Sequence, residues 1–183
     1  KMILVNTVQN HKKHKEILLN LIDEFAGVND TRIYDLQVAS SVQTIVPNMT
    51  SDWSIEKDAK REYLEYFYNH VIYDIMENFG YLLGLSRSNW NIINGWYMQY
   101  GENGEHDWHN HIDSGHFTNV YFLELPDSEY KTQLLGRDGK ILEYEAKEGD
   151  VVSIPSWQLH RSPKNGPKRK TTVLFNSEFE FIG

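Results

Sequence analysis

The sequence predicts an α+β, mainly β protein: a double-stranded β-helix (jelly roll) with N-terminal helices packed on its outside. Two observations predict this fold. Helical spacing of apolar residues is confined to the first half of the chain, and short β-rich runs fill the second half. Helices followed by many short strands are typical of an antiparallel sandwich or small barrel. The length of 183 residues fits a single domain, with a mostly helical support region at 1–88 and the jelly-roll core at 89–183.

Two helices are predicted in the first half. In His11–Ala26, apolar residues recur at steps of three and four, which places them on one helical face. A similar stripe runs over residues 54–83, and Ser51 or Asp52 is the candidate to cap its start. The chain at 32–47, between the two helices, is predicted to be extended and irregular.

The second half is predicted to hold the strands, because β-branched and aromatic residues dominate several short runs there. These runs are Asn91–Tyr100, Phe117–Leu125, Tyr130–Leu135, Lys140–Ala146, Val151–Pro155, Thr171–Phe175 and Glu178–Ile182. A Gly-Arg-Asp-Gly turn separates the third run from the fourth, so that these two are predicted to form a hairpin.

Composition and charge exclude several classes of protein. The formal net charge of −8 with neutral His makes binding to a nucleic-acid backbone an unfavourable expectation. No apolar stretch approaches the ~18 residues of a membrane span, and no N-terminal run has the pattern of a signal peptide. Cysteine is absent, which excludes disulfides and thiol chemistry. We expect a cytoplasmic protein without membrane or nucleic-acid partners.

Four of the eight histidines lie between residues 106 and 116, after one predicted strand and before the next. Side chains two residues apart share one side of an extended chain, so His109 with His111, or His111 with Asp113, can bind one ion. His160 is a remote ligand, because a buried strand and a Pro-marked bend precede it. Two ligands at this spacing and a distant His predict the three-ligand site of non-haem Fe(II) enzymes, with open positions for small ligands.

A third element begins ten residues after His160. Lys170 and Thr172 share one face of an apolar strand, and a cation with a hydroxyl beside a metal suits a carboxylate ligand. A basic surface turn is the alternative explanation, because Lys168 and Arg169 directly precede Lys170. His-rich loops and single histidines are also often structural, but their joint presence in one β-rich half favours a metal site.

In this order and spacing, the motifs resemble the 2-oxoglutarate/Fe(II)-dependent oxygenases. The resemblance is greatest to the prolyl 4-hydroxylase-like branch and its small bacterial and phage relatives, 2-oxoglutarate/Fe(II) oxygenases that share these motifs. The stretches that carry it are Trp108–His111 leading to Val120–Leu123, Glu148–His160, and Lys170–Asn176. It covers about residues 90–177.

The resemblance implies metal ligands. His160 would be the distal iron ligand. The small relatives show Trp-His-x-His, which favours His109 and His111 as the proximal ligands. The His-x-Asp motif of the broader family favours His111 and Asp113 instead. Both assignments contain His111.

The resemblance also implies a cosubstrate site. Lys170 would pair with the far carboxylate of 2-oxoglutarate, and Thr172 would assist it. Tyr100 lies where the family often has a tyrosine that touches the cosubstrate. Phe122 stands where many members have a second tyrosine, so one expected hydrogen bond is missing.

The activity that the resemblance implies is oxidative. The protein would be a dioxygenase that uses Fe(II), 2-oxoglutarate and O2, with ascorbate among its cofactors. It would decarboxylate 2-oxoglutarate to succinate and hydroxylate an unidentified small-molecule or peptidyl substrate. Iron would perform the chemistry, and the protein would orient the reactants and exclude water.

Two other functions remain open from the sequence. Residues 149–165 resemble the second cupin motif, but no Glu follows His111 at the distance that the first cupin motif needs. A cupin would share the jelly roll and the metal without 2-oxoglutarate, and Lys170 with Thr172 argues against it. The other alternative is a catalytically inert jelly-roll module that binds a partner.

Overall fold

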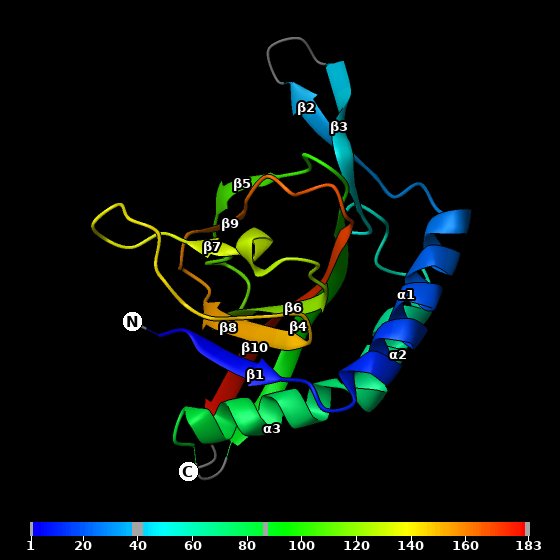
Figure 1. Cartoon of the computed structure of the whole chain (residues 1–183). Coiled ribbons are helices and arrows are strands. Elements are labelled where there is room, and N and C mark those ends of the chain that lie inside the picture. The colour runs from blue at the N-terminus through cyan, green and yellow to red at the C-terminus, as the bar shows by residue number, and fades with distance from the viewer. Residues whose placement is uncertain (1, 38–41, 86–87, 182–183) are drawn as a thin grey trace.

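The computed structural model describes residues 2–37, 42–85 and 88–181, and its elements form two antiparallel sheets with helices on one side (Figure 1). The strands are β1 (Leu4–Thr7), β2 (Arg32–Gln37), β3 (Val42–Ser51), β4 (Ser88–Tyr100), β5 (His106–His109), β6 (Phe117–Glu124), β7 (Gln133–Leu134), β8 (Asp150–Pro155), β9 (His160–Ser162) and β10 (Lys170–Phe181). The helices are α1 (His11–Val28), α2 (Glu62–His70) and α3 (Ile72–Leu82), with a 3-10 turn at Ser128–Tyr130.

The larger sheet has seven strands in the order β1-β8-β6-β10-β4-β3-β2, and the smaller has three in the order β5-β9-β7. Strand β10 pairs with both β4 and β6 and is therefore central. Its side chains alternate between two apolar clusters. Val173 and Phe175 pack against the helices, whereas Leu174 packs on the opposite face. Such alternation is expected where both faces of a sheet are covered.

The three helices cover one face of the larger sheet, with α1 and α2 on one flank and α3 beside β1 (Figure 1). Their inward residues, such as Leu18, Ile22, Phe67 and Phe79, are fully buried against the sheet. Each fully buried side chain of this size contributes roughly 1.5–3 kcal/mol relative to exposure. The predicted arrangement, a jelly roll with helices outside it, is confirmed.

The second predicted helix differs from the structure. The range 54–83 divides into α2 and α3, which separate at Val71, and α2 begins only at Glu62. The capping prediction is wrong, because Ser51 ends β3 and the residue preceding α2 is Arg61. Asp52 instead has a buried tertiary role: its carboxylate accepts from Arg61 Nε at 2.8 Å and from Tyr97 N at 3.0 Å.

The first half is also less helical than predicted. It supplies β1, β2 and β3, and the segment expected to be irregular at 32–47 lies largely in the β2–β3 hairpin. Sequence periodicity missed these strands because β1 is short and β2 mixes charged with apolar residues. In the part of the chain that the structure describes, no helix has the length and apolar character needed to cross a membrane.

Four of the seven predicted strand runs also need correction. The last two form one strand, β10, with a register shift between Asn176 and Ser177, and residue 182 lies outside the described residues. The hairpin predicted at 130–146 reduces to β7 and one isolated bridge between Leu135 and Ile141. Gly139 has a φ of 76°, which the turn between them requires and which glycine adopts without strain.

Candidate metal and cosubstrate site

A cavity of about 620 Å³ lies on the face of the larger sheet opposite the helices. Strands β2, β3, β4 and β10 of the larger sheet contribute to its lining, as do β5 and β9 of the smaller one. His109, His111, His160 and Lys170 all line it, so the motifs that are far apart in sequence share one cavity.

Strand pairing brings the three histidines together. β5 runs antiparallel to β9, and His109 is the register partner of His160. His111 follows β5, and its N–H donates to the Ser156 carbonyl at 2.8 Å, which holds the turn against the end of β8. Their candidate ligand atoms all lie within 4.8 Å of one another.

The tautomers of two rings are set by backbone carbonyls. His109 Nδ1 lies 2.7 Å from the Asp107 carbonyl oxygen, and His160 Nδ1 lies 2.9 Å from that of Gln158. A carbonyl can only accept, so each Nδ1 carries the proton and each Nε2 keeps its lone pair. His160 Nε2 is buried without a hydrogen-bond partner among the described residues. A free lone pair opposite an Nδ1–H to carbonyl bond is the usual state of a metal-binding histidine.

Burial keeps these rings neutral at pH 7. Loss of hydration, with a smaller contribution from neighbouring histidines, lowers the pKa of His111 to about 4 and that of His160 to about 3. The ring of His111 also stacks on Trp96, with 5.5 Å between centroids and 12° between planes. A neutral, oriented imidazole is the form that binds a metal, and imidazole ligands suit Fe, Zn, Cu and Ni. The three histidines therefore fit a metal ion.

Lys170 is buried in the same cavity, with 1% of its surface exposed. Its ammonium donates to Ser162 Oγ at 2.5 Å and to the Tyr130 carbonyl at 2.9 Å, and lies 4.3 Å from the centre of the Tyr100 ring. It forms no ion pair with any carboxylate in the described part of the chain. Burial without a counterion lowers its pKa to about 7.

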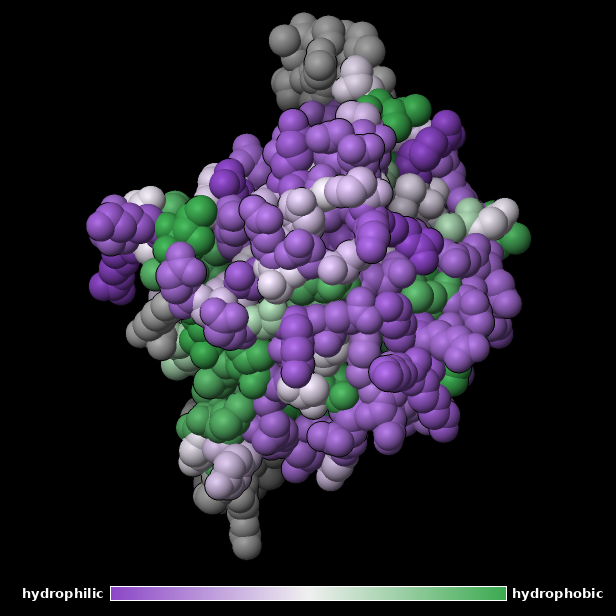
Figure 2. Space-filling view, viewed as in Figure 1, coloured by the Kyte–Doolittle hydropathy of each residue, from purple (hydrophilic) through white to green (hydrophobic). Residues whose placement is uncertain are grey.

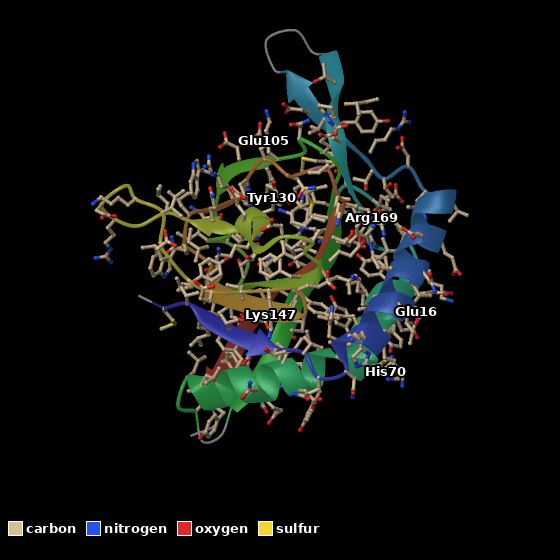
Figure 3. All side chains as sticks on the ribbon, in the orientation of Figure 1. Glu16, His70, Glu105, Tyr130, Lys147 and Arg169 are labelled. Atoms are coloured by element: carbon tan, nitrogen blue, oxygen red, sulfur yellow. The ribbon has the colours of Figure 1, made fainter. Side chains whose placement is uncertain are left out.

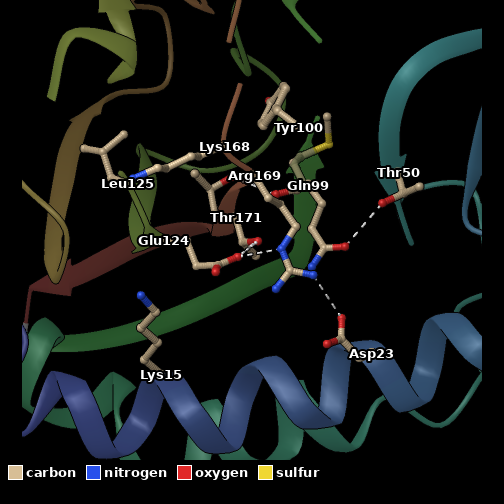
Figure 4. Close-up of polar contacts among 12 residues, drawn as sticks. Lys15, Asp23, Thr50, Gln99, Tyr100, Glu124, Leu125, Lys168, Arg169 and Thr171 are labelled. Atoms are coloured by element: carbon tan, nitrogen blue, oxygen red, sulfur yellow. Dashed lines mark hydrogen bonds and ion pairs between the residues drawn. The ribbon is translucent and has the colours of Figure 1, made fainter. Parts of the chain in front are cut away.

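The neighbouring bases point the other way. Arg169 Nε pairs with Glu124 at 2.8 Å, Arg169 Nη1 lies 3.4 Å from Asp23 on α1, and Lys168 is exposed (Figure 4). A basic surface turn therefore explains Lys168 and Arg169 but not Lys170. The predicted inward orientation of Lys170 is confirmed.

Comparison of the sequence with protein-family models and with curated proteins finds no match. Solved structures match over almost the whole chain. A prolyl hydroxylase from Trichoplax adhaerens, in complex with a peptide fragment of the hypoxia inducible factor oxygen degradation domain, is 12% identical, with a TM-score of 0.64 over 95% of this chain and 82% of its own.

The viral collagen prolyl hydroxylase of Paramecium Bursaria Chlorella virus-1, a 2-oxoglutarate complex, has a TM-score of 0.59 at 11% identity, covering 97% of this chain and 95% of its own. The epimerase SnoN, in complex with Fe3+, alpha ketoglutarate and nogalamycin RO, has a TM-score of 0.63 at 10% identity, covering 96% and 78%. The chain has the fold of the prolyl 4-hydroxylase-like 2-oxoglutarate/Fe(II) oxygenases.

Within this fold, Asp113 is separated from the histidine group. It lies in the exposed turn after His111 and is not among the residues whose ligand atoms converge. His106, at the start of β5, stacks on His109 with 4.0 Å between ring centroids. His116 is engaged elsewhere, because its Nδ1 accepts the backbone N–H of Phe179 at 3.3 Å.

The predicted cosubstrate residues also lie at the cavity. Tyr100 and Thr172 are buried and line it, whereas Phe122 is buried in the adjacent apolar cluster. Sequence reasoning missed Ser162, the hydroxyl that contacts Lys170. The two-residue step from His160 along an extended chain places both side chains on one face and would have identified it.

Proposed function

We propose that this protein is a 2-oxoglutarate- and Fe(II)-dependent dioxygenase that hydroxylates a substrate and releases succinate. One observation carries the proposal: three neutral histidines with converging ligand atoms line the same cavity as one buried lysine, which has no carboxylate partner among the described residues. A cupin would use the histidines to bind a metal but would have no use for the buried lysine, and an inert module would need neither. Neither explains an ammonium that is buried at considerable cost without an anion.

His109, His111 and His160 would hold the metal. The set contains no carboxylate, so it leaves the full double charge of the ion to attract an anionic cosubstrate. The backbone carbonyls of Asp107 and Gln158 fix the rings of His109 and His160 before the metal arrives. Asp113 is the alternative third ligand. The geometry favours His109, because His109 and not Asp113 has a ligand atom close to those of His111 and His160.

Lys170 would bind the far carboxylate of 2-oxoglutarate, assisted by the hydroxyls of Ser162 and Thr172 and by Tyr100, which line the cavity with it. Bound iron would supply the activation of O2 that couples decarboxylation of 2-oxoglutarate to substrate hydroxylation. Ascorbate, as a reductant, belongs to the same proposal. The two ends of the cosubstrate would thus be held by β9 and β10, which keeps it in one orientation.

The experiment is anaerobic titration of the Fe(II)-loaded protein with 2-oxoglutarate, followed by visible absorption and melting temperature. A ligand that binds only the folded state raises its stability, by about 2.7 kcal/mol at a hundred times its Kd. We expect both signals in the wild type and in Arg169→Ala. Lys170→Met should lose the response to 2-oxoglutarate while still binding metal, whereas His160→Ala should weaken metal binding itself.

The outcomes separate the candidate functions. A metal-loaded wild type whose spectrum and melting temperature ignore 2-oxoglutarate would point to a cupin-like site. A wild type that binds no divalent metal would point to an inert module. If Arg169→Ala rather than Lys170→Met removes the response, the assignment of Lys170 is wrong.

A further inference from the structure

The mouth of the cavity is acidic. Asp35 on β2 and Glu105 and Asp107 at β5 line the cavity with exposed side chains. None of the three carboxylates forms an ion pair with a described residue. Figure 3 shows Glu105 over β5, on the side of the molecule from which the β2–β3 hairpin projects, and Figure 2 shows that the surface there is hydrophilic.

Among the residues that the structure describes, a single cation besides Lys170 lines the cavity, and neutral groups hold it in place. Arg161 Nε donates to Gln133 Oε1 at 2.8 Å, and its guanidinium lies 4.6 Å from the centre of the Trp108 ring. On the hairpin, Arg32 is neutralised by Asp30 at 2.7 Å. Both partners of Arg161 are neutral, so it keeps its charge and offsets at most one of the three carboxylates. The mouth therefore retains a negative potential.

Aromatic rings stand beside the carboxylates. Trp53 lines the cavity with 56% of its surface exposed, and its ring packs edge-to-face on Trp96 at 4.6 Å between centroids. Trp96 in turn stacks on His111, so a single ring, that of Trp96, separates Trp53 from the three histidines. Tyr34 on β2 is a second exposed ring of the lining. Carboxylates combined with open aromatic faces are the chemistry that binds ammonium and guanidinium groups.

The interior of the same cavity is largely apolar apart from the metal and cosubstrate groups. Its buried lining includes the side chains of Met49, Met98, Val120 and Leu174, and Ser51 and Thr132 add two hydroxyls to it. The apolar side chains exclude water and accept hydrocarbon, not charge. A ligand that fits both parts has an uncharged aliphatic portion inside and a positive charge at the mouth.

We propose that the substrate carries an ammonium or guanidinium group, held by Asp35, Glu105 and Asp107 at the mouth, next to an apolar portion that enters the cavity. This inference rests on the proposed function and adds the substrate class to it. Two sources share the chemistry: an apolar residue flanked by Lys or Arg in a basic peptide, and a small aliphatic amine.

The test uses the protein loaded with Fe(II) and 2-oxoglutarate without O2. The ligands are short peptides of equal length in which a central Leu is flanked by Lys, Gln or Glu, together with hexylamine. Calorimetry measures their affinity at low and high ionic strength. We expect the Lys-flanked peptide or hexylamine to bind at least about tenfold more tightly than the Glu-flanked peptide, and salt to reduce the difference.

The combined variant Asp35→Asn, Glu105→Gln and Asp107→Asn should lose this preference. The matched control replaces Glu16, Glu24 and Glu180 by Gln, which removes three exposed charges remote from the cavity lining and should keep the preference. Figure 3 shows Glu16 on α1, across the molecule from Glu105. The control separates binding at the mouth from general attraction to an acidic protein.

Failure of the two proposals looks different. If 2-oxoglutarate leaves the spectrum of the metal-loaded protein unchanged, the proposed function fails. If the spectrum responds but the ligands bind without regard to charge, or none binds, the substrate inference is overturned. An equal loss of preference in the control variant also overturns it. Binding of hexylamine without the Lys-flanked peptide assigns the source to a small amine, and the reverse assigns it to a peptide.

Discussion

The two faces of the larger sheet are built from the same strands but hold different kinds of residue. The helix-covered face is a continuous apolar cluster that includes Tyr63, Phe67, Phe79 and Phe175. The opposite face has its own apolar cluster, yet it borders a cavity of about 620 Å³ that also contains buried charged and polar groups. One face is therefore filled by core packing, whereas the other borders open space.

Strand β10 shows the difference within a single element. Residues of one parity, Val173 and Phe175, pack into the helix-side cluster. Residues of the other parity, Lys170, Thr172 and Leu174, line the cavity. Because side chains alternate along a strand, one segment can pack into the core on one face and line the cavity on the other, and polar residues at alternate positions mark the cavity-lining face.

Adjacent residues of β10 offer the largest test of this difference. Phe175→Ala should destabilise the protein by about 3–5 kcal/mol, because it removes a ring from a filled core. Leu174→Ala should destabilise it less, near the lower end of the range of about 2–5 kcal/mol, because its side chain already borders open space. Urea unfolding measures both free energies. Equal losses would show that the two faces are packed alike.

The second prediction concerns the proposed metal ligands, which the smaller sheet brings to the cavity. His109→Ala should lower the affinity for a divalent metal about a hundredfold or more, equivalent to about 3 kcal/mol, because one of three ligands is lost. Asp113→Asn should leave the affinity unchanged, since Asp113 lies outside the converging group. Competition with a chelator of known affinity measures both. A large loss in Asp113→Asn and none in His109→Ala would reverse the assignment.

Much of this site could be predicted from the sequence, because short periodicities are local. The two-residue step between His109 and His111, and between Lys170 and Thr172, is enough to place each pair on one face of an extended chain. The choice between His109 and Asp113 as a ligand could not be made from local sequence. It depends on the pairing of β5 with β9, which places His109 opposite His160.

The predicted start of the second helix was wrong for a similar reason. Asp52 has the side chain of a helix cap, but its tertiary partners Arg61, Tyr63 and Tyr97 draw it into the interior, and the helix begins ten residues later. Capping preference is worth only about 1 kcal/mol, whereas depriving a buried carboxylate of a partner costs about 3–5 kcal/mol. The acidic mouth was likewise invisible, because Asp35 reaches it from a hairpin that periodicity did not reveal.

The smallest expected effect is on the pH dependence of folding stability, which reports the charge of Lys170. Burial lowers its pKa from the ordinary 10.5 to about 7 in the folded protein without cosubstrate. The unfolded state therefore binds more protons between pH 7 and 10.5, and stability should rise with pH across that window. Below pH 7 the buried charge carries its full penalty. Lys170→Met, an apolar replacement of similar length, should stabilise the apoprotein by about 1 kcal/mol or more at pH 7 and remove this slope.

Protonation of Lys170 should also control the affinity for 2-oxoglutarate. Only the ammonium form can pair with a carboxylate, so binding of 2-oxoglutarate must draw a proton to Lys170 above pH 7. Its affinity in the wild type should therefore fall by up to about tenfold per pH unit above 7. Lys170→Arg retains the charge at every pH in this range and should bind without the decline. Titration calorimetry of the metal-loaded proteins between pH 6 and 9 compares them. If the affinities of wild type and Lys170→Arg for 2-oxoglutarate decline in parallel, another group controls the pH dependence of binding. Pairing with the cosubstrate would then not explain why Lys170 is buried.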